Sequence, residues 1–509
     1  MKTTTILGAL ALAGATACGA APTATIDFTA PTGPINKWLH CSGYGPRSYP
    51  RSLENDDKDL AALHLTAART HDWALTNNGQ RIVDTQYIFP LEHLDPSDPR
   101  NYVFEPTDHV LELAQNIGMK IFYRMGTSIE HTGKWFFNAR NPPDHARYAE
   151  SLAGIVRHYT QGWGNGFKWD IANWEIYNEP NVKPCWRGTK AEFIDLYVTC
   201  LKRLKSEFPH LNIGGPAFAG CPTDYMKELL AACRQAGVAP DFMSWHYYGQ
   251  NPKDLVAQPA RVRKLLDEAG FPKCKTIINE WHYLVTWDGI HGASSQDKIR
   301  KAHSGPSAHN GIDSAAFNLA VLAGFQNTCL DQAYYYGSGC RGNWGYKDGL
   351  GRFNKSYWSL KIFGDIVSGY ADKVAAASAT PSVTAFAGLT ADRKRGFVLV
   401  SDYRGKEPLT ASVKGMEGAR VASAHVLDHT RDLEPVAVEW KDGTLTLPRK
   451  DENSAAFFVV FERQLTPGSE APRRGGPAGG ASAPPPRRRA GAPPRAGPRA
   501  CPSAPRSRP

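Results

Sequence analysis

The feature of this sequence that most restricts its fold is a regular alternation of short β-rich runs with longer amphipathic stretches between about residues 35 and 369. Eight runs are typical of strands: Lys37–Gly43, Ala67–His71, Lys120–Gly126, Ile171–Tyr177, Asn212–Ala217, Phe242–Tyr247, Thr276–Trp281 and Gln332–Gly337. Apolar residues at helical spacing occupy the stretches between them, among them Pro106–Ile117, Asp144–Tyr159, Lys190–Phe208, Thr223–Ala236, Asp254–Ala269 and Ser307–Asn327. Eight strands that are each followed by a helix predict an α/β fold, the (β/α)8 TIM barrel.

A doubly wound open sheet would show the same alternation. Two glutamates favour the barrel, because Glu179 comes just after the fourth run and Glu280 ends the seventh. In a barrel, the C-terminal ends of the strands surround the active site, and strands four and seven are about opposite one another. Both carboxylates can therefore converge on one substrate.

Between about residues 371 and 463 the helical spacing stops and short strand-like runs follow: Val383–Leu389, Gly396–Asp402, Leu409–Lys414, Arg420–Leu427, Leu445–Leu447 and Ala455–Phe461. The Asp442-Gly443 pair is typical of a hairpin turn. These runs predict an accessory β-sandwich at residues 371–463, after a catalytic domain at residues 24–370. The strand-like segment near Ala24–Phe28 is a candidate to join the sandwich.

The N-terminal residues predict an export signal within residues 1–23. Lys2 precedes an uncharged run from Ile6 to Ala17, which is short for a membrane span but suits a signal segment. Cys18 leaves two alternatives open, a lipid anchor at Cys18 or simple cleavage near Ala17 to Ala24. We expect an exported protein that is secreted, periplasmic or lipid-anchored, with no transmembrane span, because no later apolar run is long enough for one.

The C-terminal residues 464–509 are rich in Pro, Gly, Ala and Arg and predict a disordered tail. Nine arginines against the single acid Glu470 give this tail +8 of the formal charge of +10. The body of the chain is therefore close to neutral. The basic balance does not indicate a nucleic-acid partner, and we expect none.

The sequence lacks the motifs that would indicate a metal site, a nucleotide-binding loop or a serine hydrolase. There are ten cysteines, eight of them between Cys41 and Cys340, and their pairing in an exported protein stays open. No CxxC pair or tight Cys/His cluster indicates a metal site. No GxGxxG or Walker loop follows a strand, and there is no GxSxG elbow of a serine hydrolase. We therefore expect neither a metal nor an organic cofactor.

Glu179 and Glu280 each follow an asparagine at the end of a predicted barrel strand. Glycoside hydrolysis needs two carboxyl groups that flank the scissile bond. In a retaining enzyme they lie about 5–5.5 Å apart, and their pKa values must differ so that one is protonated and the other ionised. We therefore predict that Glu179 and Glu280 are the catalytic residues.

The segment 174–181 (WEIYNEPN) resembles the acid/base signature of the glycosidase clan whose catalytic glutamates lie on strands four and seven. Within that clan the chain is similar to glycoside hydrolase family 39, the family of β-xylosidases and α-L-iduronidases. The similarity continues through Ala68–Asp72, Asn116–Lys120 and Ser244–Tyr248 and covers most of residues 35–463.

This resemblance implies a role for three residues. Glu179 would be the acid/base, Asn178 the hydrogen-bond partner of the sugar 2-hydroxyl, and Glu280 the nucleophile. The chain departs from the family's pattern at Arg124–His131. It also departs in the long polar segment Trp287–Ser307, for which we expect a lid.

Further side chains at strand ends are candidates for substrate binding. His71 and His246 end strands two and six, where an imidazole can bond sugar hydroxyls or orient a glutamate; a structural role is the alternative. Tyr248 can hydrogen-bond the nucleophile. Trp344, after strand eight, can stack on a sugar face or belong to the barrel wall, and the same alternatives hold for Trp73, Trp135 and Trp281. Glu175 is predicted to pair with Arg69 inside the barrel, and Glu130 is a third carboxylate near the mouth.

The sequence thus predicts a retaining glycoside hydrolase that cleaves O-glycosidic bonds by double displacement in an oligosaccharide, polysaccharide or glycoconjugate. Two alternatives stay open, a non-catalytic carbohydrate-binding protein on the same scaffold and a transglycosylase. The sugar, its linkage, endo or exo cleavage and the oligomeric state are also left open.

Overall fold

The computed structural model describes residues 23–46, 56–71, 82–128, 139–288, 290, 295–337, 343–348 and 350–463. The predicted export signal, the Arg-rich tail, Trp73, Glu130 and Trp135 lie outside these described residues.

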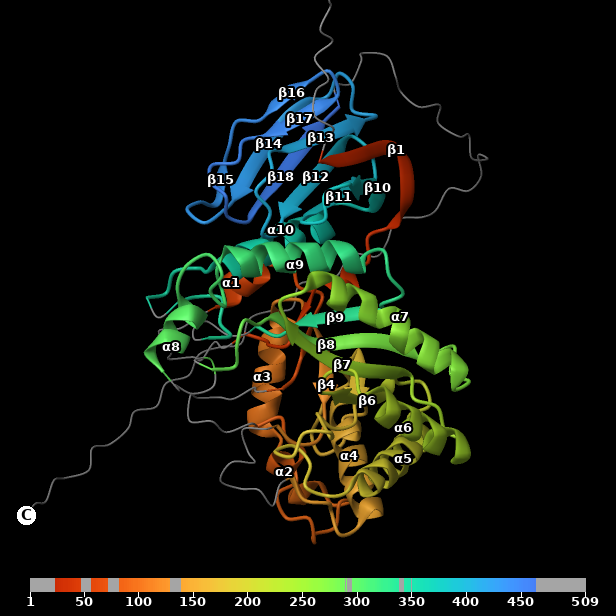
Figure 1. The fold of residues 1–509 in the computed structure, drawn as a ribbon. Coiled ribbons are helices and arrows are strands. Elements are labelled where there is room, and N and C mark those ends of the chain that lie inside the picture. Colours follow the sequence, from red (N-terminus) through yellow and green to blue (C-terminus); the bar gives the residue numbers. More distant parts are fainter. Residues whose placement is uncertain are drawn as a thin grey trace, which may run out of the picture. The chain divides into compact units, whose positions relative to one another are not determined.

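Eight parallel strands close into a barrel in chain order (Figure 1). They are β2 (Cys41–Ser42), β3 (Ala67–Arg69), β4 (Lys120–Arg124), β5 (Asn173–Glu175), β6 (Ile213–Phe218), β7 (Phe242–Gly249), β8 (Lys275–Tyr283) and β9 (Gln332–Tyr335). The predicted TIM barrel is confirmed. The first strand is shorter than predicted, because Lys37–Leu39 form a 3-10 turn (η1) that the Asn36 side chain caps by accepting from the Trp38 N–H.

Helices follow the strands and cover the outside of the barrel. They are α1 (Asp57–Ala61), α2 (Thr85–Ile88), α3 (Glu105–Asn116), α4 (His145–Thr160), α5 (Lys190–Glu207), α6 (Thr223–Gln235), α7 (Pro252–Glu268), α8 (Gln296–His303), α9 (Ile312–Phe325) and α10 (Lys355–Gly369), with a further 3-10 turn η2 (Pro99–Asn101). The predicted lid segment contains α8, and the rest of it is only partly described.

Aromatic side chains close the barrel interior below the mouth. Phe122 of β4 lies 5.4 Å from Phe242 of β7 and 5.0 Å from Tyr334 of β9, measured between ring centroids. Cys41, Ala67 and Ile277 complete this buried layer. The interior is therefore a packed core rather than a pore, as is usual in this fold, and any site must lie above the layer.

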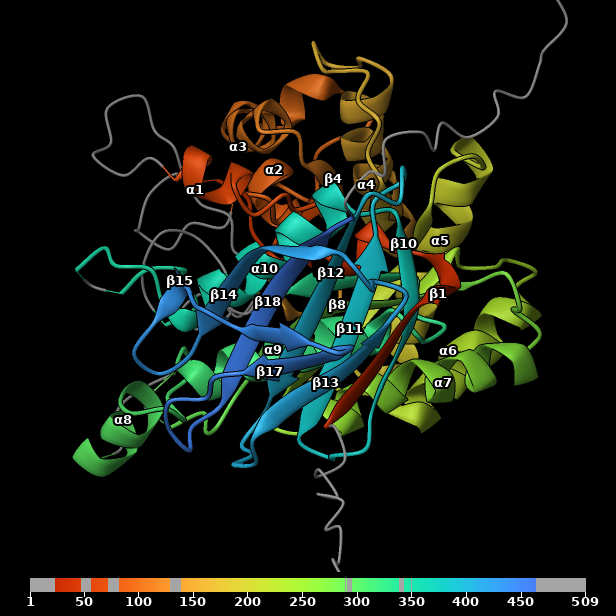
Figure 2. The same ribbon diagram turned by 90° about the horizontal axis from the view of Figure 1, so that it is seen from above.

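The remaining strands form one sheet of ten. They are β1 (Ala24–Pro34), β10 (Asp372–Ser378), β11 (Val383–Leu389), β12 (Arg395–Asp402), β13 (Leu409–Lys414), β14 (Arg420–Leu427), β15 (Asp432–Pro435), β16 (Glu439–Lys441), β17 (Thr444–Leu447) and β18 (Ala455–Glu462). The N-terminal strand β1 lies between β10 and β13 (Figure 2). Asp442 and Gly443 both have positive φ and form the predicted hairpin turn between β16 and β17.

The sheet curls over so that its two halves face each other, as in a sandwich. Phe461 of β18 lies 6.5 Å from Phe28 of β1 and 5.1 Å from Trp440 of β16, although these strands are not neighbours in the sheet order. The curled sheet thus has its own apolar core. Its other face packs on the barrel helices, where Phe386 stacks on Phe363 of α10 at 6.0 Å.

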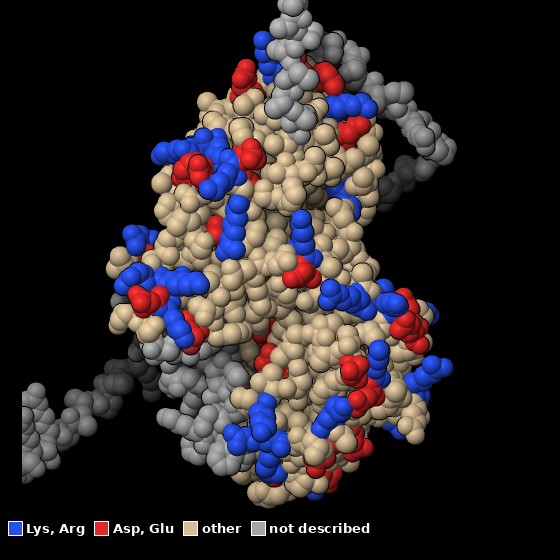
Figure 3. Space-filling view, viewed as in Figure 1, with Lys and Arg blue, Asp and Glu red and all other residues tan. Residues whose placement is uncertain are grey.

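On the face shown in Figure 3, basic and acidic side chains are interspersed. Within the described ranges, no helix is long and apolar enough to cross a bilayer. Among the described residues, six cysteines are free thiols: Cys41, Cys200, Cys221, Cys233, Cys274 and Cys329.

Candidate active site

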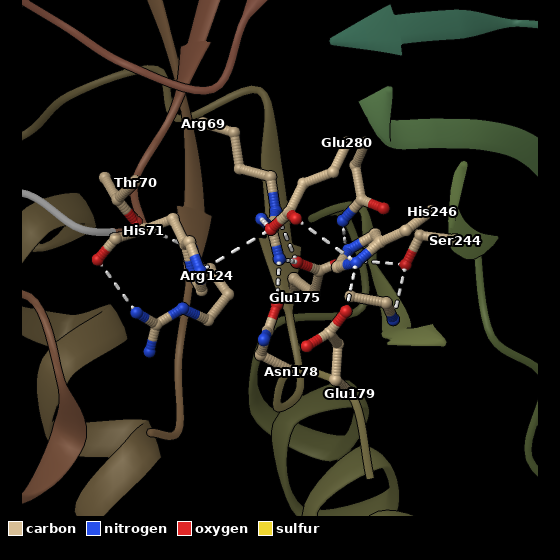
Figure 4. Close-up of polar contacts among 12 residues, drawn as sticks. Arg69, Thr70, His71, Arg124, Glu175, Asn178, Glu179, Ser244, His246 and Glu280 are labelled. Carbon is tan, nitrogen blue, oxygen red and sulfur yellow. Dashed lines mark hydrogen bonds and ion pairs between the residues drawn. The ribbon is translucent and has the colours of Figure 1, made fainter. Parts of the chain in front are cut away.

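Glu179 lies in the loop that follows β5, the fourth barrel strand. After Glu175 the chain leaves the strand through two residues with left-handed backbone, Tyr177 (φ +77°) and Glu179 (φ +48°). Such a conformation costs a non-glycine residue about 1–3 kcal/mol, so surrounding contacts must hold it. One of them joins the Glu179 N–H to the Ala217 carbonyl oxygen of β6 at 3.0 Å. The turn directs the Glu179 carboxyl toward β7 (Figure 4).

A bulge in β8, the seventh barrel strand, brings two consecutive residues into the barrel. The pairing with β7 shifts between Ile278 and Glu280, which leaves Asn279 as an extra residue. Neighbours in a regular strand point to opposite faces. Here, however, the Asn279 amide donates to Glu175 Oε1 at 2.6 Å. The next carboxyl, Glu280, also points inward and accepts from Arg69 at 2.8 Å. The bulge therefore aims Glu280 at the barrel mouth.

His246 of β7 joins the two predicted catalytic carboxylates. Its Nδ1 lies 2.8 Å from Glu179 Oε1 and 3.3 Å from Glu280 Oε2. One oxygen of each glutamate lies within 4.8 Å of the other. The Glu280 side chain is 5% exposed and that of Glu179 is 18% exposed. The two predicted residues thus come together at the barrel mouth, and Glu179 is the more exposed of the two.

The imidazole of His246 is neutral near pH 7, because burial lowers its pKa to about 4. A neutral imidazole carries one N–H. Since both carboxylates face Nδ1, we infer that this nitrogen carries the proton and donates to Glu179. His246 thus lies where it can orient a glutamate, one of the two roles expected for it, and its contact with the sugar stays a prediction.

Arg69 of β3 connects the nucleophile candidate to the fourth strand. Its fully buried guanidinium donates to Glu280 Oε1, Glu175 Oε2 and Asn178 Oδ1, each at 2.8 Å (Figure 4). The predicted pair of Glu175 and Arg69 is confirmed, and Ser244 also donates to Glu175 at 2.5 Å. The contact of Arg69 with Glu280 was not predicted, because spacing along the chain does not show which carboxylates an arginine reaches.

The groups around Glu280 shift the pKa of its carboxyl in opposite directions. Burial raises the pKa of Glu280, and the carboxylate of Glu179 adds to this effect. Positive charge on His246, the Arg69 guanidinium and a hydrogen bond from Tyr248 lower the pKa, and where His246 is neutral only the last two act. The net effect is an upward shift of the Glu280 pKa, because burial outweighs the groups that stabilise the ionised carboxylate.

Tyr248 and His71 both lie against Glu280, as expected for site residues. The Tyr248 hydroxyl donates to Glu280 Oε2 at 2.7 Å. His71 Nε2 lies 3.6 Å from Glu280 Oε1, beyond a normal hydrogen bond. The main-chain oxygen of His71 accepts from Arg124 at 2.9 Å, and Arg124 forms a buried ion pair with Asp84. Arg124 and Asp84 therefore fix the end of β3.

Aromatic rings form one wall beside Glu280. Trp344 lies 5.7 Å from the ring of Tyr248 and 5.1 Å from that of Tyr336, and Trp287 is 5.1 Å from Tyr248. Tyr336 follows β9 and was not among the predicted site residues. Trp281 belongs to the barrel wall, because it packs outward on Phe317 and Phe325 of α9 and on Tyr335 of β9.

Glu179, His246 and Glu280 are also the group of ligand-type side chains in the described residues that lie close enough to hold a metal ion. All three have a direct role in the arrangement of the two carboxylates. The expectation that the site works without a metal stays a prediction.

Two proteins of known name share sequence with this chain. A β-xylosidase from Geobacillus stearothermophilus is 28% identical over 169 residues, which make up 29% of this chain and 33% of that protein. An α-L-iduronidase from Homo sapiens is 23% identical over 270 residues, 49% of this chain and 39% of that protein. The chain thus spans well under half the length of either relative.

A solved structure of a glucosidase from Croceicoccus marinus has the same fold. Its TM-score is 0.68 at 21% identity, over 87% of this chain and 99% of that chain. The sequence of residues 33–280 matches the family model described as glycosyl hydrolases family 39. This range ends at Glu280 and contains both glutamates of the site. Residues 33–280 of this chain, which hold the barrel strands β2 to β7 and the start of β8, therefore match a domain of glycosyl hydrolases family 39.

Proposed function

We propose that this protein is a retaining glycoside hydrolase with Glu280 as the nucleophile and Glu179 as the acid/base. The observation that carries the proposal is the approach of the two carboxylates to within 4.8 Å at the barrel mouth. A retaining enzyme needs about 5–5.5 Å between them, whereas an inverting enzyme needs about 6.5–9.5 Å to admit a water molecule. Export of the protein is part of the proposal and rests on the hydrophobic segment near its N-terminus.

In the first step, a Glu280 oxygen attacks the anomeric carbon while the bond from that carbon to the leaving oxygen breaks. Glu179 gives its proton to the leaving oxygen. In the second step the ionised Glu179 takes a proton from water, the water oxygen attacks the same carbon, and the bond to Glu280 breaks. His246 holds Glu179 in place through both steps, because its neutral Nδ1–H donates to Glu179 Oε1 in either charge state.

The proposal is tested by screening aryl xylosides, iduronides and glucosides, chosen from the names of the similar proteins, followed by NMR of the first-formed sugar. We expect the released sugar to keep its anomeric configuration. A 2-deoxy-2-fluoro glycoside with a good leaving group should label the peptide that contains Glu280, as seen by mass spectrometry. Inversion, or a label on another residue, would contradict the mechanism. Binding without any product supports the non-catalytic alternative, and products longer than the substrate support a transglycosylase.

Removing the Tyr248 hydroxyl should move the acid limb of the pH profile of kcat/KM to higher pH. Glu280 must be ionised to attack, so activity is present above its pKa and lost as the pH falls through it. In Tyr248→Phe the pKa of Glu280 rises because the ionised form loses a hydrogen bond of about 1.5–3 kcal/mol. We expect the acid limb of kcat/KM to shift up by about 1–2 pH units. Tyr247→Phe is the matched control, since its hydroxyl donates to the Asn251 carbonyl oxygen at 3.1 Å, away from the carboxylates. An unchanged limb in Tyr248→Phe would contradict the assigned contact.

Replacing Asn178 should weaken the contact with the sugar 2-hydroxyl that the family resemblance implies. Its Oδ1 is occupied by Arg69, whereas its buried Nδ2 has no hydrogen-bond acceptor among the described residues. We expect Asn178→Ala to lower kcat/KM by about 10- to 100-fold on a normal aryl glycoside. On the 2-deoxy analogue of that glycoside, the variant and the wild type should differ far less. An equal loss on both substrates would mean that Asn178 acts through the fold rather than through the sugar.

A further inference from the structure

The C-terminal sheet contacts the barrel through the loop that follows β12. Tyr403 and Arg404 are the first residues of this loop, and Arg404 has a left-handed backbone (φ +59°). Its N–H donates to Ser454 Oγ at 2.9 Å, which fixes the turn to the start of β18. The loop is therefore held firmly by the sheet at the point where its side chains reach the barrel.

The guanidinium of Arg404 binds three barrel residues. Its Nε donates to Asp313 Oδ2 of α9 at 2.8 Å. Its Nη2 donates to the Tyr283 hydroxyl at 2.8 Å and to Gln250 Oε1 at 3.0 Å. The neighbouring Tyr403 hydroxyl donates to the Gln250 carbonyl oxygen at 2.6 Å. A planar fork with several fixed donors is suited to holding separate segments in one geometry.

Two of these three residues end the strands that carry the active site. Gln250 comes two residues after Tyr248 of β7, and Tyr283 comes three residues after Glu280 of β8. The two strands are paired at this point, with Gly249 opposite Tyr283. Arg404 thus joins the ends of β7 and β8 just beyond the hydrogen bond between Tyr248 and Glu280.

The Arg404 side chain is 40% exposed, so solvent screens its ion pair with Asp313 and the pair adds little to stability. Its bonds to the neutral Tyr283 hydroxyl and Gln250 amide instead restrict where the two strand ends lie. The contact that depends on the position of these strand ends is the hydrogen bond of 2.7 Å from the Tyr248 hydroxyl to Glu280 Oε2.

We propose that Arg404 is a positioning residue: it holds the ends of β7 and β8 so that the Tyr248 hydroxyl donates to the nucleophile Glu280. The C-terminal sheet is thereby part of the catalytic apparatus rather than an independent module. This inference rests on the proposed function in one respect, the role of Glu280 as nucleophile.

The charged and titratable groups that face Glu280 come from three strands. They are Arg69 and His71 from β3 and its end, Glu179 from the loop after β5, and His246 and Tyr248 from β7. Arg404 contacts none of them directly, so any effect of Arg404 on Glu280 must pass through the backbone of β7 and β8 or act at long range through its charge.

The test compares the pH profile of kcat/KM in the full-length wild type, Arg404→Gln, Tyr248→Phe and the double variant. Arg404→Gln should shift the acid limb upward by about 0.5–1 pH unit, a part of the Tyr248→Phe shift. In the Tyr248→Phe background, Arg404→Gln should add no further shift, because the bond that it positions is already absent. Additive shifts would show that Arg404 acts by its charge and would overturn the proposal.

Lys355→Gln is the matched control. Lys355 of α10 also joins the barrel to the sheet, through Asp432 Oδ1 at 2.5 Å and the Arg431 carbonyl oxygen at 3.1 Å, but it does not contact β7 or β8. It should lower Tm about as much as Arg404→Gln and leave the pH profile unchanged. Equal pH shifts in both variants, or a fall in Tm without any shift in Arg404→Gln, would reduce Arg404 to a structural contact.

A measurement that needs no substrate can test the role of Arg404 independently of the proposed function. The pKa of the Glu280 carboxyl can be followed by NMR in protein labelled with 13C at the glutamate carboxyl, with Glu280→Gln to assign the signal. If no glycoside is hydrolysed, the proposed function fails, yet the same four-variant comparison of this pKa still supports or overturns the role of Arg404.

Discussion

Glu280→Gln should lower kcat on every accepted substrate by about 10⁴-fold or more, since loss of a catalytic nucleophile removes the covalent pathway. The fold should be retained. Glutamine still offers an oxygen to Arg69, and Arg69 keeps its ion pair with Glu175 at 2.6 Å. The measurement is kcat on the best aryl glycoside, with Tm from thermal unfolding as the check on folding.

The control for this variant is Glu268→Gln on α7, a glutamate whose side chain is 57% exposed and lies 3.8 Å from Lys264 of the same helix. It should leave kcat and Tm unchanged. Near-normal turnover by Glu280→Gln, with the control also normal, would remove Glu280 from the mechanism. A large loss in the control would show that the assay reports on protein quality.

Glu179→Ala should give a loss that depends on the leaving group. General acid catalysis contributes about 10²- to 10⁴-fold, and it matters most where the departing oxygen is strongly basic. We expect losses of that size for alkyl glycosides and oligosaccharides. Activated aryl glycosides should lose least in the step that breaks the glycosidic bond. The basic limb of the pH profile should also disappear, since it reports the loss of the Glu179 proton. The measurement is kcat/KM for a series of aryl glycosides whose leaving groups differ in pKa.

The result that would contradict this assignment is a uniform loss across the series with the basic limb retained. Such a result would place the acid elsewhere and leave Glu179 as a hydrogen-bond partner of His246. Because His246 Nδ1 also lies 3.3 Å from Glu280 Oε2, the imidazole could then turn its N–H to that carboxylate.

The fold could be predicted from periodicity because each barrel strand is a short buried run between two amphipathic helices. Errors occurred where the local sequence is weak in β-forming residues. The strand β10 (Asp372–Ser378) is largely alanine in its second half and was not predicted; it forms because β1 and β11 provide hydrogen-bond partners on both sides. The short strands β15 and β16 were missed for the same reason, since tertiary pairing and not propensity creates them.

The site was predicted by residue type and motif, but its geometry could not be. A regular β8 with Asn279 inside the barrel would turn Glu280 outward, and only the bulge brings both residues inside. Nothing in the spacing of apolar residues marks that bulge. Likewise, the contact of Arg69 with Glu280 depends on the barrel closing, since the two residues are far apart in the chain.

The place of β1 in the sheet has a consequence for how the newly made chain acquires its structure. Ala24 lies beside Ser378 on one side and Ala411 on the other. All barrel strands, from Cys41 to Tyr335, are made after β1 and before either partner. Strand β1 therefore stays unpaired until β10 and β13 have been made, whereas the barrel can close as soon as β9 has left the ribosome. Pairing between such distant segments is slow, so we expect the N-terminal strand to be among the last elements to find its place.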